Sequence, residues 1–248
     1  MTSIPITPKH VLNEKARNEL KRVNSTAILD VLVRNGFDPK HIYMPNLTTL
    51  TPGLRLVARA ITVRFVPFRS DLEQKKPDGE DSPEYAAFEI AGPGDVIAME
   101  AMQTKLMSVG GDIKLLRLMQ RGVDGLITDG GIRDMHIVRE YGIGIWSYGK
   151  TSNQGSRVGI PYSTNDTINV DNVAIEPGDY IVADDDGVVI IPREKAIDIH
   201  HQALEYDRFE DWVKNNVEDK KVSPSHYYRN DNKTMEQFRK YENNKSGI

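Results

Sequence analysis

The segment from residue 110 to residue 149 constrains the fold more than any other, because it alternates glycine-rich turns with apolar runs. Residues 110–112 (GGD) read as a turn, and the apolar residues that follow recur at helical spacing. Residues 123–128 are short and apolar, as in a buried strand, and Asp129-Gly130-Gly131 is a turn signal that should end this strand. A second helix and a strand at residues 143–146 follow. This order predicts a βαβ-type unit in an α/β protein, with two polar turns that approach each other.

These two turns carry residue types that suit an anionic ligand and a cation. Asp112 begins the first helix, and the free amides of its first turn suit a carboxylate or a phosphate. Arg133 and Asp134 lie just past the carboxyl end of a strand, where ligands collect in α/β folds. Arg133 offers a planar fork for a carboxylate, and Asp134 is a hard oxygen ligand of the kind that Mg²⁺ or Mn²⁺ takes. A helix cap with a surface ion pair would explain the same dipeptide.

The D-x20-R-D arrangement of Asp112, Arg133 and Asp134 resembles the signature of the RraA-like family. Further matching runs are RGVDGLITDGGIRD (121–134), PGDYIVADDDGVVIIPRE (177–194), PGLRLVARAITVRF (52–65) and GPGDVIAMEAM (92–102). The family includes class II, metal-dependent 4-hydroxy-4-methyl-2-oxoglutarate/4-carboxy-4-hydroxy-2-oxoadipate aldolases and the non-enzymatic regulator of ribonuclease activity A. The resemblance implies a swivelling β/β/α-type domain and a homo-oligomer, a trimer or a hexamer, with sites between subunits.

The resemblance also implies a divalent-metal-dependent lyase that acts on a small 2-oxo or hydroxy acid through a pyruvate-type enolate, by aldol cleavage or by oxaloacetate-type decarboxylation. We expect Asp134 to bind Mg²⁺ or Mn²⁺ and Asp112 to hold a metal-bound water or orient the cation. Arg133 should stabilise the charge that grows on the ketone oxygen. The expected catalytic residues are therefore Arg133 and Asp112, and the expected substrate-binding residues are Gly111, Asp112, Ile113, Lys114, Leu115 and Arg133.

One position departs from the family pattern and leaves other functions open. Aldolase-like members extend the motif to R-D-x2-[E/D], whereas this chain has Ile137, which cannot supply an anion. His136 is adjacent, but successive side chains on a helix point about 100° apart. A metal-dependent dehydratase or hydratase of a sugar-type acid is one alternative, and a non-catalytic protein-binding regulator is another. A Schiff-base aldolase that uses Lys105, Lys114 or Lys150 is a third.

Other polar residues have structural explanations. Asp30 lies among apolar residues of a helix that Gly36 ends, and we expect its side chain to face solvent. Glu100, near the end of a strand, could face either the site or solvent. The run 184–186 precedes Gly187 in a hairpin pattern, which favours a turn over a metal site. Residues 69–84 are polar and predict an exposed loop, either mobile or functional as a lid.

Composition narrows the class of protein. The chain of 248 residues has no cysteine, which excludes disulfides and thiolate sites and suits a reducing cytoplasm. A net charge of −4 gives no general attraction to nucleic acid, and no apolar run approaches the roughly 20 residues of a membrane span. The expected partner is a small organic acid, with neither nucleic acid nor membrane.

We expect an RraA-like α/β domain with N-terminal helices over residues 1–200, followed by a helical extension over residues 201–248. This extension is hydrophilic, and its aromatic residues could anchor it on a neighbouring subunit. These residues are Tyr227, Tyr228, Phe238 and Tyr241.

Overall fold

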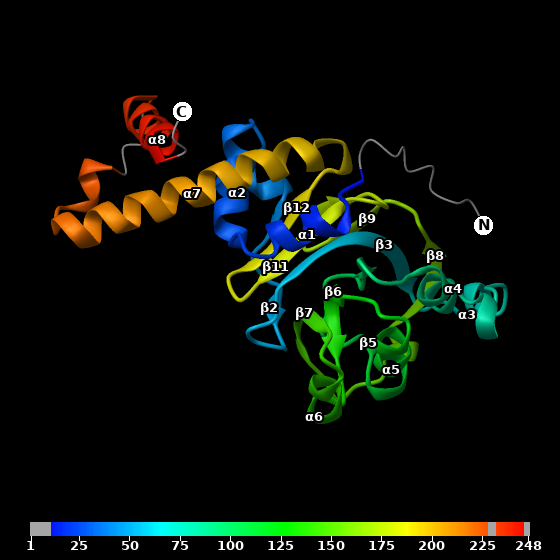
Figure 1. Cartoon of the computed structure of the whole chain (residues 1–248). Coiled ribbons are helices and arrows are strands. Elements are labelled where there is room, and N and C mark those ends of the chain that lie inside the picture. Colours follow the sequence, from blue (N-terminus) through cyan, green and yellow to red (C-terminus); the bar gives the residue numbers. More distant parts are fainter. Residues whose placement is uncertain (1–10, 228–231, 246–248) are drawn as a thin grey trace.

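A computed structural model describes residues 11–227 and 232–245 as a mixed α/β fold, with a central sheet and helices at both ends (Figure 1). The predicted α/β class is therefore confirmed. The described strands are β1 (Tyr43–Met44), β2 (Thr48–Thr49), β3 (Leu56–Pro67), β4 (Asp95–Glu100), β5 (Ser108–Gly110), β6 (Gly125–Ile132), β7 (Gly144–Lys150), β8 (Gly159–Thr164), β9 (Ile168–Val170), β10 (Val173–Ile175), β11 (Tyr180–Asp184) and β12 (Gly187–Ile191).

Ten of the described strands form one sheet, and β9 and β10 form a separate hairpin. The main path of the sheet runs β1–β12–β11–β3–β4–β6–β7–β2, with β5 paired to β6 and β8 paired to β3. The pairs β3–β4, β4–β6, β5–β6 and β6–β7 are parallel, so the carboxyl ends of these strands point the same way. The predicted βαβ unit lies in this parallel part.

The helices divide between the two ends of the sheet (Figure 1). The helices α1 (Glu14–Leu20), α2 (Ser25–Arg34), α7 (Ala196–Lys220) and α8 (Asn232–Lys245) share a hydrophobic core with β11 and β12. The helices α4 (Pro83–Ile90), α5 (Asp112–Gln120) and α6 (Met135–Val138) share another core with β4 and β6. Shorter elements are α3 (Ser70–Glu73), η2 (Pro39–His41), η3 (Gly79–Asp81), η4 (Arg139–Tyr141), η5 (Gly155–Arg157), η6 (Arg193–Lys195) and η7 (Pro224–His226).

The long strand β3 joins the two ends. Its first residues pair with β11, its middle residues pair with β4, and its last residues pair with β8. Most of its side chains are buried on both faces of the sheet, which explains why this apolar segment alternates only in part.

The acidic run before Gly187 forms a turn, as its sequence predicts. Asp184 lies opposite Gly187 in the β11–β12 hairpin. Its carboxylate accepts hydrogen bonds from the Ser25 amide at 2.8 Å and from the Ser25 hydroxyl at 2.6 Å. Asp184 therefore holds the start of α2 against the hairpin. Asp30 is exposed, as expected, and accepts a hydrogen bond from the Tyr206 hydroxyl at 3.2 Å.

The strand after α5 does not end at residue 128, and this part of the prediction was wrong. β6 continues to Ile132, with a shift in register between Thr128 and Gly131. The glycines serve close packing here, because a Cβ at Gly130 would lie 2.7 Å from the Cβ of Ala101. Asp129 is fully buried in this strand and accepts hydrogen bonds from the amides of Ala101 and Gln103.

The segment 69–84 is more regular than its composition predicts. It contains α3, η3 and the first residues of α4. Pro83 stands in the first turn of α4, where proline needs no amide partner and fits the helical backbone angle. Residues 73–81 are mostly exposed, as expected, and a lid function stays a prediction.

The C-terminal helices pack on the same chain. α7 has 25 residues and is continuous across position 200, with Ile199 and Ala203 both buried. A division at residue 200 would cut this helix, so the domain boundary stays a prediction. Phe238 is buried, and its ring lies 5.6 Å from that of Phe209. Tyr227 packs on Trp212 at 5.3 Å.

Phe238 and Tyr227 therefore anchor the extension on its own α7, which corrects the expectation that they dock on another subunit. The cause is that Phe209 and Trp212 supply an aromatic face within the chain. Tyr241 is exposed at the surface of α8, and Tyr228 lies outside the described residues. Within the described ranges, no helix has both the length and the apolar character needed to cross a bilayer.

The buried carboxyl group of Asp129 predicts a pH-dependent stability. Burial raises the pKa of Asp129 from 3.8 to about 6, although hydrogen bonds from the amides of Ala101 and Gln103 oppose this shift. The folded state therefore binds the proton more tightly than the unfolded state, and this stabilisation is complete below about pH 4 and is lost as the pH rises through 6. We expect the free energy of unfolding of the wild type, relative to Asp129→Asn, to fall by about 2 kcal/mol between pH 4 and pH 7.

Urea denaturation of both proteins across this pH range measures the difference, in which the other titrating groups cancel. A difference that stays constant with pH would show that Asp129 has an ordinary pKa in the folded protein.

Candidate active site

The turn before α5 and the turn before α6 lie in direct contact, although twenty residues separate Asp112 from Arg133. The Arg133 amide donates to the Gly110 carbonyl at 3.1 Å, and the Gly131 amide donates to the Met107 carbonyl at 2.8 Å. The Asp112 amide donates to Oδ2 of Asp134 at 3.3 Å. The structure thus brings Asp112, Arg133 and Asp134 together.

This contact requires glycine at position 111. The φ of Gly111 is −160°, an extended value that any residue can adopt, so the backbone conformation does not explain the glycine. A Cβ at this position would lie 2.8 Å from Cγ of Arg133 and would also collide with Oδ2 of Asp134. Glycine is needed because the Arg133–Asp134 pair occupies the space of a side chain.

Asp134 is held in an unusual conformation. It occupies the N-cap of α6 with φ 57° and ψ 31°, in the left-handed region that residues other than glycine seldom adopt. Its Oδ2 accepts hydrogen bonds from the Asp112 amide and from Nε of Arg133, both at 3.3 Å. Its Oδ1 accepts no hydrogen bond from any residue that the structure describes. One oxygen of Asp134 is therefore fixed by the protein and the other is available.

Asp112 shows the same division of its two oxygens. Its Oδ1 accepts a hydrogen bond from the Tyr141 hydroxyl, and Oδ2 has no donor among the described residues. This hydrogen bond, with partial burial and the nearby charge of Asp112, raises the pKa of Tyr141 to about 12, so the hydroxyl stays protonated. Sequence reasoning missed Tyr141. It stands in η4, eight positions after Arg133, where no spacing rule points to it.

Arg133 and Asp134 border two neighbouring depressions. One has a volume of about 370 Å³ and is lined by Ser108, Gly110, Gly111, Asp112, Ile113, Lys114, Arg133, Asp134, Gln154, Gly155 and Ser156. The other has a volume of about 360 Å³ and is lined by Ile132, Arg133, Asp134, Met135, His136, Lys150, Thr151 and Ser152. The side chains of Arg133 and Asp134 are 38% and 36% exposed, so a dissolved ligand can reach both.

Three predicted substrate-binding residues of α5 differ in whether their amides are available to a ligand. The Leu115 side chain is buried and its amide donates to the Gly111 carbonyl at 3.0 Å, so the amide is not available to a ligand. The expectation that Leu115 binds substrate was wrong, because its amide already closes the first helical turn. The amides of Ile113 and Lys114 precede this closure and have no carbonyl partner within the helix.

The side chain of Lys114 is paired with a carboxylate of α4. Its ammonium nitrogen lies 2.9 Å and 2.8 Å from the two carboxylate oxygens of Glu84 and 5.7 Å from the centre of the Tyr85 ring. Lys114 can therefore contribute its backbone amide to the site. Its paired ammonium argues against a Schiff-base role.

The candidate Glu100 and the position of the missing family acid, Ile137, both lie outside the two depressions. Glu100 pairs with Arg64 at 3.7 Å and accepts a hydrogen bond from the Asn169 amide at 3.2 Å, so it faces neighbouring strands. Ile137 lines neither depression. His136 and Lys150 line the second depression, beside Arg133 and Asp134.

The carboxylates fit an open Mg²⁺ or Mn²⁺ site better than a closed metal cage. Among the described residues, no three His, Asp or Glu side chains converge closely enough to hold a metal ion. Mg²⁺ in proteins commonly uses only one or two carboxylates and keeps several waters. The available oxygens of Asp134 and Asp112 match that requirement, whereas a structural zinc site needs four ligands.

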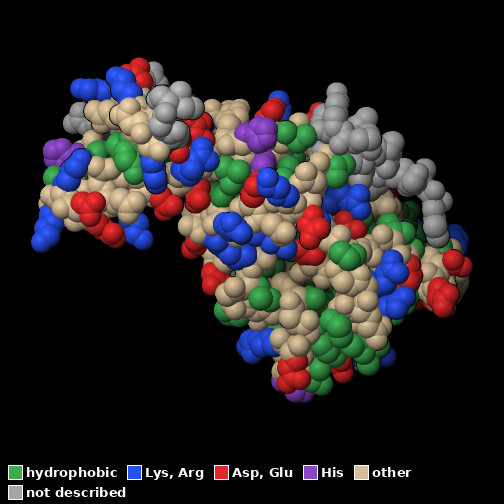
Figure 2. All heavy atoms as spheres, viewed as in Figure 1, with side chains coloured by type: hydrophobic (Ala, Val, Ile, Leu, Met, Phe, Trp, Pro, Cys, Tyr) green, Lys and Arg blue, Asp and Glu red, His purple; other side chains and the backbone are tan. Residues whose placement is uncertain are grey.

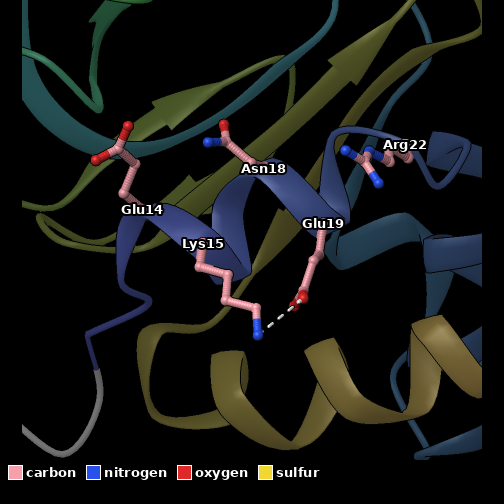
Figure 3. A pocket seen from close by; sticks show the side chains of 5 residues that line it. All are labelled: Glu14, Lys15, Asn18, Glu19 and Arg22. Atoms are coloured by element: carbon pink, nitrogen blue, oxygen red, sulfur yellow. Dashed lines mark ion pairs between the residues drawn. The ribbon is translucent and has the colours of Figure 1, made fainter.

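A further hollow of about 490 Å³ lies along α1, on another part of the molecule (Figure 3). Its described lining residues are Glu14, Lys15, Asn18, Glu19 and Arg22, which all belong to α1 or to the turn after it. Lys15 and Glu19 form an ion pair at 3.8 Å (Figure 3). This hollow carries charges of both signs and shares no residue with the two depressions.

Comparison with known families identifies one for this chain. The family model described as RraA-like: Aldolase/RraA matches residues 25–190. A protein of Halalkalibacterium halodurans, provisionally named 4-hydroxy-4-methyl-2-oxoglutarate aldolase, is 36% identical over 103 residues, which are 42% of this chain and 49% of that protein. The chain thus spans about half the length of this curated relative.

Solved structures extend the likeness to most of the fold. Streptomyces coelicolor RraAS2, described as an unusual member of the RNase ES inhibitor RraA protein family, is 29% identical with a TM-score of 0.72, over 82% of this chain and 97% of that one. An uncharacterized protein from Pseudomonas syringae pv. tomato has a TM-score of 0.74 at 20% identity, over 96% of this chain and 100% of that one. At that identity the second likeness concerns the fold alone.

A methyl group at position 111 tests the contact between the two turns. In Gly111→Ala the new Cβ must displace the Arg133–Asp134 pair, because the backbone on both sides is hydrogen-bonded. We expect Mn²⁺ affinity, measured by electron paramagnetic resonance, to fall at least about tenfold, as when supporting contacts of metal ligands are lost. Gly92→Ala is a matched control, because Gly92 is not in the left-handed region and the atom nearest to a Cβ there, the Arg121 carbonyl oxygen, lies 4.0 Å away. Wild-type affinity in Gly111→Ala would contradict this account.

Proposed function

The chain belongs to the RraA-like (Aldolase/RraA) family, and from this we propose that it is a divalent-metal-dependent lyase acting on a small 2-oxo or hydroxy acid. The reaction would pass through a pyruvate-type enolate, by aldol cleavage or by decarboxylation of an oxaloacetate-like acid. The provisional aldolase name of the Halalkalibacterium relative supports an aldolase-type lyase. The observation that carries the proposal is the convergence of Asp112, Arg133 and Asp134 at an open depression.

In the proposed mechanism, Arg133 recognises the oxygen on which charge develops. Its Nε is hydrogen-bonded to Asp134, and its two terminal nitrogens have no partner among the described residues. A guanidinium can donate to the ketone oxygen of the substrate and more strongly to the enolate oxygen of the product. This difference lowers the barrier, because a contact that strengthens in the transition state raises the rate.

The start of α5 would hold the substrate carboxylate. The amides of Ile113 and Lys114 point out of the first helical turn without intrahelical partners, beside the depression that Ile113 and Lys114 line. The positive end of the helix dipole favours an anion at the same place. This contact would orient the bond to be cleaved relative to Arg133.

Asp134 would hold the divalent cation through its available oxygen, and Asp112 would hold a metal-bound water through its own. When bound, Mg²⁺ or Mn²⁺ supplies Lewis-acid polarisation of the 2-oxo group. The fixed oxygen of Asp134, tied to Arg133 and to the Asp112 amide, keeps the carboxylate in one orientation. The cation and the guanidinium of Arg133 would thus both contact the 2-oxo end of the substrate.

Regulation of another protein is the second candidate function. The Streptomyces protein, at 29% identity and with 97% of its length covered, is described as belonging to an RNase ES inhibitor family. A regulator of that kind would bind its target without turning over an organic acid. The dehydratase alternative stays a prediction for which we find no further support.

Pyruvate release from 4-hydroxy-4-methyl-2-oxoglutarate and from oxaloacetate, with Mg²⁺ or Mn²⁺ and with EDTA, tests the lyase proposal. We expect Asp134→Ala to lose the metal-dependent rate, and Arg133→Ala to lower kcat about 10²–10³-fold, the usual cost of removing one donor to a developing anion. Arg117→Ala is the control, because Arg117 pairs with Glu89 on the exposed side of α5.

Each result has a distinct meaning. Wild-type turnover in Asp134→Ala would exclude its role as metal ligand, and retention of activity in EDTA would exclude the metal. Trapping of substrate by borohydride would instead reveal a Schiff base. A wild-type protein without any lyase activity would favour the regulator.

We also propose a homo-oligomer, a trimer or a hexamer, in which a neighbouring copy covers the surface beside the site. Ile113, which lines the depression, is 75% exposed, and Leu106, two residues before the lining residue Ser108, is 61% exposed. Figure 2 shows hydrophobic side chains gathered over the part of the molecule that contains β5 and α5. Exposed apolar surface of this kind marks interaction sites.

Light scattering coupled to size-exclusion chromatography tests this proposal. Leu106→Glu should lower the molar mass toward that of one chain, because a carboxylate would be buried without a partner. Val33→Glu, on an exposed face of α2, is the control that should leave the molar mass unchanged. A monomeric wild type, or an unchanged Leu106→Glu, would contradict the proposed interface.

A further inference from the structure

Tyr141 connects the core to the proposed site through a single hydrogen bond. We propose that Tyr141 is a positioning residue, which holds Asp112 so that one carboxylate oxygen faces the depression where the cation and substrate would bind. This inference rests on the proposed function and adds to it a residue outside the D-x20-R-D motif.

The first step concerns the freedom of Asp112. It is the first residue of α5, at a surface position where its side chain could turn toward solvent. Among the described residues, the Tyr141 hydroxyl is the donor that contacts its carboxylate. Without that hydroxyl, the carboxylate of Asp112 has no donor among the described residues, and its amide stays bonded to Oδ2 of Asp134.

The second step concerns the rigidity of Tyr141. Its ring packs against the core cluster that includes Leu115 and Val138. Nε of Arg139, in the same η4 turn, donates to the Leu50 carbonyl at 3.1 Å. The phenol hydroxyl therefore stands on a support that is fixed by the core, and it can hold Asp112 in one orientation.

The third step is a comparison with a second tyrosine–aspartate pair in the chain. The Tyr148 hydroxyl donates to Oδ1 of Asp171 at 2.7 Å, and Asn46 occupies both oxygens of the same carboxylate, at 2.8 Å and 2.9 Å. Both oxygens of the Asp171 carboxylate thus accept hydrogen bonds from the protein. At Asp112 the tyrosine engages one oxygen and the other has no donor among the described residues, although Asp112 lines a depression. A ligand-binding carboxylate requires such an available oxygen.

This bond and the bond from the Asp112 amide together link the three segments that build the proposed site. Asp112 belongs to the start of α5, its amide is bonded to Asp134 at the start of α6, and its carboxylate is bonded to Tyr141 in η4. Loss of the hydroxyl should loosen Asp112 relative to Asp134 while leaving the aromatic ring in the core. The expected defect is therefore weaker ligand binding in a folded protein.

The test is Mn²⁺ binding to the full-length protein, measured by electron paramagnetic resonance, for the wild type, Tyr141→Phe, Asp112→Ala and the double variant. Tyr141→Phe keeps the ring and removes the hydroxyl, and circular dichroism and the melting temperature report whether the fold is retained. Tyr148→Phe removes the same type of bond away from the depressions and is the matched control. Binding of oxalate, a planar dianion that resembles the enolate of pyruvate, is measured in parallel by calorimetry.

We expect Tyr141→Phe to weaken Mn²⁺ binding about tenfold, with a matching loss for oxalate in the presence of Mn²⁺. The loss should be absent when Asp112 is already alanine, because Tyr141 acts through Asp112. Tyr148→Phe should keep wild-type affinity, whatever it does to the melting temperature.

Wild-type affinity in Tyr141→Phe, or an equal further loss in the Asp112→Ala background, would overturn the inference while leaving the proposed lyase intact. A wild-type protein that binds no Mn²⁺ would instead overturn the proposed function, and this inference with it.

Discussion

The contact between the glycine turn before α5 and the Arg133–Asp134 pair is the constraint on which the site depends. The two segments approach so closely that a Cβ at Gly111 would collide with the pair, and hydrogen bonds between main-chain groups hold them together. Main-chain hydrogen bonds therefore hold the two turns together. Within that frame, the bond from the Asp112 amide to Asp134 and the bond from the Tyr141 hydroxyl to Asp112 position the two carboxylates.

The parallel strands explain why these turns meet. β5, β6 and β7 are parallel neighbours, so the segments that leave β5 and β6 emerge at the same edge of the sheet. This edge is where ligands bind in open α/β folds. β6 also carries Asp129, whose carboxylate accepts hydrogen bonds from two backbone amides in the segment between β4 and β5. One strand thus uses a buried carboxylate to hold its neighbour and ends in the exposed pair of the proposed site.

Local sequence patterns predicted the parts of this structure that depend on local chemistry. The helical spacing after Asp112 and the Asp-Gly turn before β12 were both confirmed, since neighbouring residues decide them. The continuation of β6 through Asp129-Gly130-Gly131 could not be predicted, because these glycines accommodate a distant segment and do not form a turn.

Contacts between distant segments also decided which predicted groups are available to a ligand. The pairing of Lys114 with Glu84 and the bond from Tyr141 to Asp112 join residues about thirty positions apart, for which a single sequence offers no signal. The amide of Leu115 is not available to a ligand for a local reason, because it donates to the Gly111 carbonyl in the first turn of α5. The motif therefore identified residues that the fold brings together, and the three-dimensional contacts determine which of their groups are available to a ligand.

The adjacency of Arg133 and Asp134 explains how one short segment could serve both charges of the proposed reaction. Arg133 uses Nε to hold Oδ2 of Asp134, which leaves its terminal nitrogens for an anionic oxygen and the second oxygen of Asp134 for a cation. A lysine has a single nitrogen at the end of a flexible chain, and it could not fix the carboxylate and face a substrate at the same time. In the proposed reaction, the guanidinium fork and the left-handed backbone of Asp134 would thus allow two neighbouring residues of opposite charge to contact one ligand.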